Sequence, residues 1–466
     1  MEIKPNEYYQ IFQPIKIGTV EIKNRVAMAP MNMNFTGPDH YPSKQQLAYY
    51  AARAQGGTGL IILEAVGATL HPTTDTYRKY NNLILSSEKY VPHLTNLVEH
   101  IRAHGAKVFA QISIGPGRQG TSELGAVQPV SASPIPWELQ LEKITKGYGS
   151  VTNLKPLVAL ARVAGYYGKV SILNVKEFLQ TMKSIPGTHM GGELPRELTE
   201  DEIQVLLHDM GVSAKCAKLA GFDGVEVHAP HGYLVHSFIS PRSNKRTDKY
   251  GGSFENRIRL LLESIIACRK RVGPDYVVGV RISASEDLPG GFDPYHTQKV
   301  AKRCEEVGAS YIHLSDGSYE ALSDFLPIKD GQVVEKAAII KQGLGIPLIC
   351  PSVHEPKLVA ETLAKGKADM ISQGRAQIAD PEWVNKVQAG QIDKITRCTR
   401  CNEGCLKRFV VGLPARCILN PEVGYEEYIE KYTQRPILPT NQRAWQTIQE
   451  IGREPSKTVD YEKFIL

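Results

Sequence analysis

Short apolar runs alternate with amphipathic stretches along most of the chain. The apolar runs lie at residues 25–28, 59–63, 107–112, 224–227, 277–282, 311–314, 347–350 and 369–372. The spacing of apolar positions between them predicts amphipathic helices, for example at residues 255–272 and 356–365. Repeated strand–helix units form a parallel sheet covered by helices, and eight such units close into a barrel. The sequence therefore predicts a (β/α)8 TIM barrel of the α/β class.

Two regions exceed what a minimal barrel needs. Residues 122–197 follow the third predicted strand, whereas βα connections usually have about 2 to 6 residues. This region has its own helical pattern at residues 175–182, so we interpret it as an insertion above the barrel mouth. We expect a barrel over residues 1–390 with this insertion and a four-cysteine segment over residues 391–424. Residues 425–466 are polar with aromatic anchors, so we expect an extended tail that wraps the body or a partner.

Composition narrows the class of protein. Of 466 residues, 42% are apolar and 22% are charged, as in ordinary soluble enzymes. No apolar run reaches the ~18 to 20 residues of a membrane helix, and the N-terminus lacks the apolar core of a signal peptide. We therefore expect a cytoplasmic protein without a membrane partner. The net charge of +6 is small and dispersed along the chain, which argues against nucleic acid as a partner.

The cysteines fall into two groups. Four are scattered through apolar segments and are expected to be free core thiols: Cys216, Cys268, Cys304 and Cys350. The other four have the spacing C-x2-C-x3-C-x11-C: Cys398, Cys401, Cys405 and Cys417. Four thiolates in a reducing compartment hold either zinc or an iron–sulfur cluster. Zinc sites usually pair two short cysteine knuckles, so three ligands on one loop and a distant fourth favour a [4Fe-4S] cluster.

One glycine motif is not given a functional interpretation. Gly115, Gly117 and Gly120 match the spacing G-x-G-x-x-G after a predicted strand. A dinucleotide site also needs a helix to begin there, but Pro116 interrupts the motif and the sequence continues as a loop. A dinucleotide-binding site is therefore disfavoured.

Active-site residues of such barrels lie at the C-terminal ends of the strands. The predicted strands end in Ala29, Pro30, Met31 and Asn32; Glu64 and Ala65; Gln111; His228; Arg281; Pro351 and Ser352; and Gly374 with Arg375. Ser352, Gly374 and Arg375 occupy the usual phosphate position, where glycine exposes backbone N–H groups and arginine adds charge; a turn with a surface arginine is the alternative. Arg281 either pairs with a buried carboxylate or stabilises a ligand anion.

His228, His231 and Tyr233 are the sharpest local signal. Two imidazoles just after a strand can point at one ligand oxygen, and a phenol two residues later can reach the neighbouring carbon. A metal half-site and a set of core histidines are the alternatives. The position at the C-terminal end of a strand favours catalysis.

Several stretches together resemble the Old Yellow Enzyme superfamily. They are FQPIKIGTVEIKNRVAMAPM, GGTGLIILEA, HGYLVHSFISPRSNKRTDKYGGSFENR, VRIS, ADMISQGRAQIADPEW and the cysteine spacing. The resemblance spans roughly residues 12–424 and is to the iron–sulfur branch, which includes 2,4-dienoyl-CoA reductase, enoate reductases and trimethylamine dehydrogenase. It implies a barrel that holds FMN, and a [4Fe-4S] cluster bound by the four closely spaced cysteines.

The resemblance also implies residue roles. FMN would be bound by Ala29, Pro30, Met31, Asn32, Ala65, Gln111 and Arg281, with its phosphate at Ser352, Gly374 and Arg375. His228 and His231 would hold a substrate carbonyl, and Tyr233 would be the proton donor. Arg242 would contact substrate, with a structural ion pair as an equal alternative. The sequence departs from the branch at Asn32, at Pro351, which removes an N–H from the phosphate site, and in the GPGR loop after strand three.

We therefore expect an ene-reductase that transfers hydride from FMN to the β-carbon of an enoyl-CoA, enoate or enone. Amine oxidation, which requires an aromatic cage, and an electron-transferring subunit are the alternatives. Branch members continue into donor domains, whereas this chain stops about forty residues after the four-cysteine segment. We thus expect a separate flavoprotein or ferredoxin as electron donor, in a homo-oligomer or hetero-complex. Lys143, Lys146 and Lys155 of the insertion would suit CoA phosphates, but a dimer contact explains the insertion equally well.

Overall fold

The core of the protein is a closed barrel of parallel strands. A computed structural model describes residues 7–70, 82–120, 128–138, 192–409 and 412–433. The barrel has the strand order β10-β11-β12-β3-β4-β5-β8-β9. Its strands are β3 (Val26–Met28), β4 (Leu60–Gly67), β5 (Lys107–Ser113), β8 (Gly224–His228), β9 (Val277–Ser283), β10 (Ile312–Ser315), β11 (Leu348–Pro351) and β12 (Met370–Gln373). Each apolar run of the sequence is a barrel strand, which confirms the predicted fold class.

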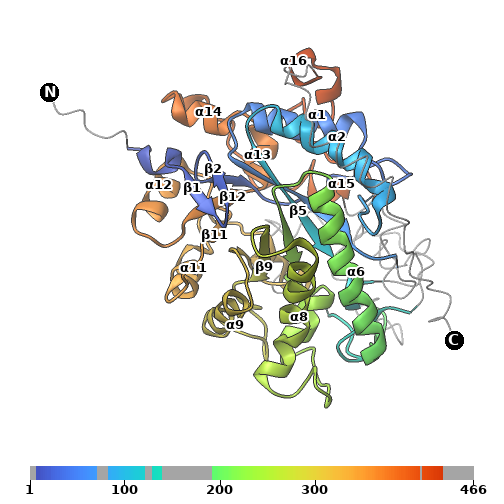
Figure 1. The fold of residues 1–466 in the computed structure, drawn as a ribbon. Helices are drawn as coiled ribbons and strands as arrows, with labels where there is room; N and C mark the ends of the chain where they lie inside the picture. The colour runs from blue at the N-terminus through green and yellow to red at the C-terminus, as the bar shows by residue number, and fades with distance from the viewer. Residues whose placement is uncertain (1–6, 71–81, 121–127, 139–191, 410–411, 434–466) are drawn as a thin grey trace, which may run out of the picture.

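Helices cover the outside of the barrel (Figure 1). The longer ones are α1 (Lys44–Gln55), α2 (Val91–Arg102), α6 (Glu200–Leu219), α8 (Phe254–Val272), α9 (Pro294–Glu306), α11 (Val334–Lys341) and α12 (Pro356–Ala364). Short helices lie beyond several strand ends: α7 (Leu234–Ile239), α10 (Leu322–Phe325), α13 (Arg375–Ala379) and α14 (Trp383–Gln388). The helices predicted at residues 255–272 and 356–365 agree with α8 and α12 to within one residue. None of the helices in the described segments has the length and apolar character needed to cross a bilayer.

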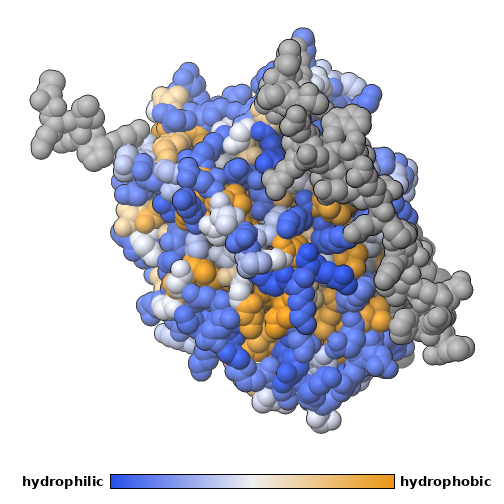
Figure 2. Space-filling model, viewed as in Figure 1, coloured by the Kyte–Doolittle hydropathy of each residue, from blue (hydrophilic) through white to orange (hydrophobic). Residues whose placement is uncertain are grey.

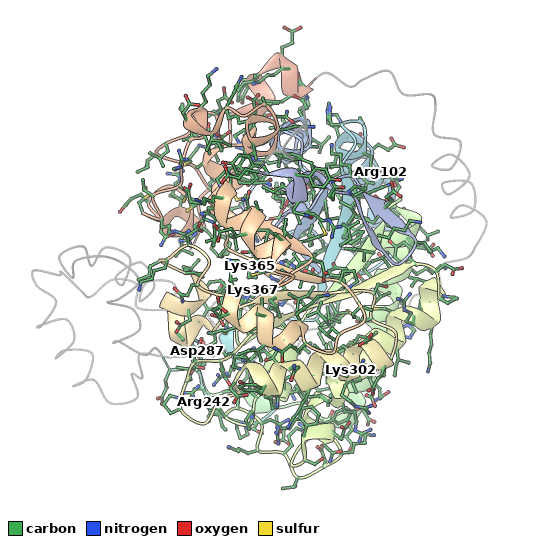
Figure 3. All side chains as sticks on the ribbon, turned by 90° about the vertical axis from the view of Figure 1, so that its left-hand side faces the viewer. Arg102, Arg242, Asp287, Lys302, Lys365 and Lys367 are labelled. Atoms are coloured by element: carbon green, nitrogen blue, oxygen red, sulfur yellow. The ribbon has the colours of Figure 1, made fainter. Side chains whose placement is uncertain are left out.

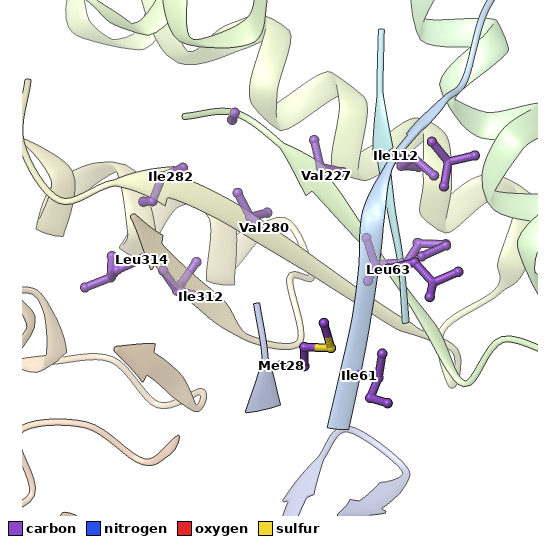
Figure 4. Packing of buried hydrophobic residues seen from close by; sticks show 14 of the residues in the cluster. Met28, Ile61, Leu63, Ile112, Val227, Val280, Ile282, Ile312 and Leu314 are labelled. Atoms are coloured by element: carbon purple, nitrogen blue, oxygen red, sulfur yellow. The ribbon is translucent and has the colours of Figure 1, made fainter. Parts of the chain in front are cut away.

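Apolar side chains fill the space between the strands and the helices. Figure 4 shows this layer with Met28, Ile61, Leu63, Ile112, Val227, Val280, Ile282, Ile312 and Leu314. A second cluster closes the N-terminal end of the barrel, where the hairpin of β1 (Ile15–Ile17) and β2 (Val20–Ile22) packs against inward-facing residues such as Phe109 and Tyr311. Figure 2 shows hydrophilic residues over much of the outer surface. The C-terminal ends of the strands are therefore the face left for a site.

The flanks of the predicted insertion pair with each other. β6 (Val130–Ser131) and β7 (Arg196–Glu197) form a short parallel ladder. The Arg246 guanidinium joins this ladder to the region after α7, because it donates to the carbonyls of Ala132 at 3.2 Å and Leu198 at 2.7 Å. The helix expected at residues 175–182, together with Lys143, Lys146 and Lys155, lies outside the described residues.

The chain after the cysteines returns to the barrel. It forms two short helices, η7 (Glu426–Tyr428) and α16 (Glu430–Thr433). Tyr432 is buried against Ala48 of α1, so one aromatic anchor of the tail packs on the barrel. These residues pack on the barrel as short helices rather than as extended chain, because contacts with α1 hold them in turns. Residues 434–466 lie outside the described part.

Candidate active site at the barrel mouth

A buried polar network lines the inside of the barrel. The Gln111 amide donates to Glu226 at 2.7 Å, and the Tyr311 hydroxyl donates to the other Glu226 oxygen at 2.9 Å. His313 lies 2.9 Å from that same oxygen and 2.8 Å from the Ser372 hydroxyl. Burial acts to raise the pKa of Glu226, but His313, Arg281 and Gln111 outweigh it and lower that pKa. The network therefore holds the predicted Gln111 on a charged carboxylate that the sequence did not reveal.

Arg281 lies beside this network and pairs in strand register with His228 and His313. Its guanidinium is 3.5 Å from the Pro30 carbonyl and 3.4 Å from the Ser315 hydroxyl, and its Nε has no hydrogen-bond partner among the described residues. The Glu226 charge acts on Arg281, but the guanidinium makes these two hydrogen bonds to neutral oxygens. A buried cation with a free donor is suited to a ligand anion.

His228 ends β8 and His231 follows it, with their ring centroids 5.5 Å apart. His231 has a φ of 69° and its Nε2 lies 2.5 Å from the Ser315 hydroxyl, whereas Nδ1 of buried His228 has no partner among the described residues. Burial, and then the Arg281 charge, hold the pKa of both imidazoles well below the ordinary value. Both rings are therefore neutral at pH 7, and each has one N–H to donate.

Tyr233 completes this group. Its ring centroid is 4.9 Å from that of His228 and 6.2 Å from that of His231. The Tyr233 hydroxyl donates to the Tyr319 hydroxyl at 3.0 Å. The structure thus brings the three residues predicted to be catalytic together, and adds a second tyrosine.

The ends of β3 and β12 meet at the mouth. The backbone N–H of Ala29 donates to the Gln373 carbonyl at 3.0 Å. A Cβ at Gly374 would lie 2.7 Å from the Met31 sulfur, so Gly374 leaves room for that side chain. The Asn32 amide donates to Asn82, which fixes the side chain that departs from the family pattern.

The end of β4 is irregular. Its register with β5 shifts between Leu63 and Val66, and Ala65 is half-buried there. The adjacent Glu64 is fully buried and accepts hydrogen bonds from the backbone N–H of Met33 at 3.2 Å and from the Gln46 amide. Burial raises the pKa of Glu64 to about 8. A carboxyl that is largely protonated at pH 7 therefore lies beside the predicted flavin contact at Ala65.

The predicted phosphate residues lie at the neighbouring ends of β11 and β12. Ser352 has a φ of 62°, and Gly374 is the residue before α13. The Arg375 guanidinium, however, donates to the Asn402 side chain at 3.1 Å and to the Pro327 carbonyl at 2.7 Å. Arg375 therefore joins the predicted phosphate position to the cysteine segment.

The four clustered cysteines are free thiols that influence one another. Burial raises the pKa of Cys405 to about 11, and the charges of Cys398 and Cys401 add to this effect; the charge of Cys417 likewise raises the pKa of Cys398. In the described segments, no three His, Cys, Asp or Glu side chains are arranged to hold one metal ion. The chemistry of the donor set, four soft thiolates, suits a cluster of several irons.

Arg242 is half-buried and forms an ion pair with Glu320 at 2.7 Å. The sequence assigned no residue after the sixth strand, yet the loop after β10 contributes Tyr319, Glu320 and Phe325 to the mouth. The Phe325 ring centroid lies 4.4 Å from that of His231 and 4.7 Å from that of Tyr319. No motif marks this loop in the sequence.

The mouth has the features that a flavin requires. Donors without partners among the described residues, Arg281 Nε and His228 Nδ1, lie beside it. Gln111 offers an amide on one side, and the glycine at position 374 leaves space beside Met31 on the other. The residues present therefore fit FMN.

Comparison with known proteins identifies relatives of the chain. Residues 10–153 and 175–394 match the family described as NADH:flavin oxidoreductase / NADH oxidase. The chain is 35% identical over 433 residues to NADH oxidase of Thermoanaerobacter brockii, which covers 92% of this chain and 58% of that protein. It is 30% identical over 445 residues to cinnamate reductase of Clostridium sporogenes, with coverage of 91% and 59%. The chain thus spans less than two thirds of the length of these relatives.

A solved structure shows the same fold. A complex of 2-naphthoyl-CoA reductase with 2-naphthoyl-CoA has a TM-score of 0.74 and 26% sequence identity. The match covers 90% of this chain and 58% of that one.

Proposed function

Because the chain belongs to the NADH:flavin oxidoreductase / NADH oxidase family, we propose that it is an FMN-dependent ene-reductase acting on a C=C bond activated by a carbonyl. One observation carries the proposal: His228, His231 and Tyr233 converge beside Arg281 at the barrel mouth. Two relatives are named for the reduction of cinnamate and of 2-naphthoyl-CoA, which are both unsaturated acyl compounds. The proposed substrate is accordingly an enoate, enoyl-CoA or enone.

The residues of the mouth divide between cofactor and substrate. Ala29, Pro30, Met31, Asn32, Ala65, Gln111 and Arg281 would hold the flavin ring, and Ser352, Gly374 and Arg375 its phosphate. Bound there, FMN would supply the hydride that the β-carbon receives. The positive charge of Arg281 would stabilise negative charge on the bound ring, because a buried guanidinium remains charged.

The histidine pair and Tyr233 act on the substrate. The neutral imidazoles donate N–H groups to the carbonyl oxygen, which accumulates negative charge as the β-carbon is attacked. Tyr233 then donates its phenolic proton to the α-carbon. Arg242 lies in the loop after α7 and pairs with Glu320. Its proposed contact with the substrate would be made from that loop.

Half-reactions of the purified protein test this proposal. The protein is reduced with dithionite without oxygen, and the flavin absorbance is followed after addition of an enone, an enoate or the oxidised product of an amine. We expect reoxidation by the unsaturated compounds only, and a loss of about 10²-fold or more for Tyr233→Phe. Reoxidation by the amine product but not by the enone or enoate would reverse the assignment.

We also propose that electrons reach the flavin site through a [4Fe-4S] cluster held by Cys398, Cys401, Cys405 and Cys417, from a donor with its own redox cofactor. The donor set supports this, since all four ligands are thiols. We expect Cys405→Ser to lower iron and acid-labile sulfide, whereas Cys304→Ser in the core leaves both unchanged. Equal metal content in the two variants, or zinc in place of iron, would remove the cluster from the proposal.

A second candidate function is amine oxidation. The rings of Tyr233, Tyr319 and Phe325 gather at the mouth, with Tyr233 and Tyr319 centroids 5.6 Å apart. Aromatic faces attract cationic substrates. Tyr319 packs on both other rings, edge to face on Tyr233 and tilted by 35° on Phe325, which leaves the ene-reductase as the better supported function.

A further inference from the structure

One buried carboxylate links four parts of the chain at the barrel mouth. The Glu320 side chain is 1% exposed. One of its oxygens accepts hydrogen bonds from Arg242 at 2.7 Å and from Arg118, and the other accepts the backbone N–H of Glu138 at 2.8 Å. Arg118 comes from the loop after β5, and Arg242 from the loop after α7 (Figure 3 labels Arg242). The loop after β10 is thereby fixed to both.

The residue before Glu320 contacts the proposed proton donor. The backbone N–H of Tyr319 donates to the His231 carbonyl at 3.3 Å, and the Gln119 amide donates to that carbonyl at 2.6 Å. The Tyr319 hydroxyl lies 3.0 Å from the Tyr233 hydroxyl. Both ends of Tyr319 are therefore held against the residues that would bind and protonate the substrate.

The Tyr319 hydroxyl is placed to return a proton to Tyr233. When Tyr233 gives its proton to the α-carbon, it becomes a phenolate in a partly buried site, where an uncompensated charge is costly. As the Tyr233 proton leaves, the Tyr319 hydroxyl can turn to donate its O–H to Tyr233 while its oxygen accepts a proton from water, so that neither ring keeps the negative charge. Burial raises the pKa of Tyr319, so the phenol is protonated at neutral pH before the reaction.

We propose that Glu320 is a positioning residue: clamped by Arg118 and Arg242, it holds the Tyr319 hydroxyl where that group returns the proton that Tyr233 gives to the substrate. The inference rests on the proposed ene-reductase function and extends it to a two-tyrosine relay. Each proton that leaves one oxygen arrives on the next, and no further oxidant or reductant is needed.

A merely structural ion pair makes a different prediction. If Glu320 only stabilised the fold, its loss would lower every activity of the protein equally. A positioning role for proton return predicts loss only where the substrate takes a proton from Tyr233. An enone and a quinone separate the two cases, because a quinone receives its protons on oxygen, where solvent can supply them.

The experiment compares Glu320→Gln, Tyr319→Phe, Tyr233→Phe and their combinations, all reduced with dithionite and reoxidised by cyclohexenone or by a benzoquinone. Glu335→Gln is the matched control, because Glu335 pairs with Lys367 at the surface and its side chain is 78% exposed. We expect Glu320→Gln and Tyr319→Phe each to slow the enone reaction about 10-fold, with the quinone rate within twofold of the parent. The double variant should be no slower than the slower single one, because both act in one step.

Backbone hydrogen exchange gives a readout independent of activity. We expect Glu320→Gln to accelerate exchange over residues 316–321, and Tyr319→Phe and Glu335→Gln to leave it unchanged. Tyr319→Phe keeps the shape of the ring, so the relay stays testable if Glu320→Gln folds poorly.

The outcomes separate the inference from the function on which it rests. Equal loss with enone and quinone in Glu320→Gln, or a parental enone rate in Tyr319→Phe while Tyr233→Phe is impaired, would overturn the relay alone. An unchanged ratio of enone to quinone rates in Tyr233→Phe would overturn Tyr233 as proton donor, and the relay with it.

Discussion

Two buried carboxyl groups near the barrel mouth have pKa values shifted in opposite directions. Glu64 is protonated by its burial, and Glu226 is kept ionised by its neighbours, although both are fully buried. Hydrogen bonds from Met33 and Gln46 do not outweigh the burial of Glu64, whereas Glu226 has His313, Arg281 and Gln111 beside it. The two carboxyl groups therefore respond oppositely to pH.

Glu64 should make stability depend on pH. Its pKa is raised from 4.5 to about 8, so the folded protein binds more protons than the unfolded chain between these values. Stability is thus highest below about pH 4.5 with respect to this group, and falls as pH rises through the folded pKa, by roughly 3 to 5 kcal/mol in total. We expect Glu64→Gln to remove that slope. Thermal midpoints between pH 5 and 8.5 measure it.

The control for this prediction is Glu361→Gln, on the surface of α12 and paired with Lys365. Its thermal midpoints should change with pH in the same way as those of the parent protein. If Glu64→Gln also runs parallel to the parent, the buried carboxyl does not titrate in this range.

At the level of single residues, sequence rules predicted only part of the candidate active site. The rule that active-site residues follow strand ends identified Gln111, His228 and Arg281. Glu226 was missed because it alternates with valines in β8, a pattern that usually marks a solvent-facing position, whereas here the position faces a polar layer inside the barrel. Tyr319 was missed because its partner Tyr233 is 86 positions away, and no local pattern records such a contact.

Among the elements, the loop after β5 shows how backbone conformation fixes the mouth. Gly117 has a φ of 63°, and a Cβ there would lie 2.7 Å from the backbone nitrogen of Leu234, at the start of α7. This close approach places the loop against the segment that holds Tyr233. Only glycine satisfies both conditions.

Gly117→Ala should therefore be more harmful than an ordinary glycine substitution. Gly290→Ala is the control, because Gly290 has a φ of 73° and no atom lies within 4 Å of the position that its methyl group would take. We expect Gly290→Ala to cost about 1 kcal/mol from strain, and Gly117→Ala about 2 to 4 kcal/mol, with slower enone reduction. Denaturant unfolding and the reoxidation assay check both. Equal losses would show that the loop yields to accommodate the methyl group.

Whole elements were easier to predict than their contacts. Each barrel strand is apolar because it is covered by helices on one side and closed into the barrel on the other, so it forms a distinct run in the sequence. The two short helices near Tyr432 were missed, because burial against Ala48 of α1, rather than local propensity, holds them.

At the scale of the whole molecule, one buried ion pair fastens the C-terminal segment to the barrel. Arg53 of α1 and Glu426 lie 2.5 Å apart, and their side chains are 0% and 2% exposed. Glu426 also accepts the backbone N–H of Gly424 at 2.6 Å. The segment that follows the cysteines is thus anchored by a charge that has no access to water.

We expect Glu426→Gln to destabilise the protein by about 3 to 5 kcal/mol, because it leaves Arg53 buried without its counter-charge. Lys431→Gln, which removes a surface pair with Glu382, should cost less than about 1 kcal/mol. Thermal unfolding and proteolysis after residue 412 measure the two effects. Equal stability of the variants would show that the anchor lies elsewhere.

The seam of the barrel has a consequence for biosynthesis. Val26 of β3 pairs with Ile371 of β12, so the first and last barrel strands become neighbours although about 350 residues separate them. At ribosomal speeds, roughly 20 to 70 seconds pass between the emergence of the two. During that interval the nascent chain presents an unpaired strand edge, which makes it a client for chaperones until translation passes residue 373.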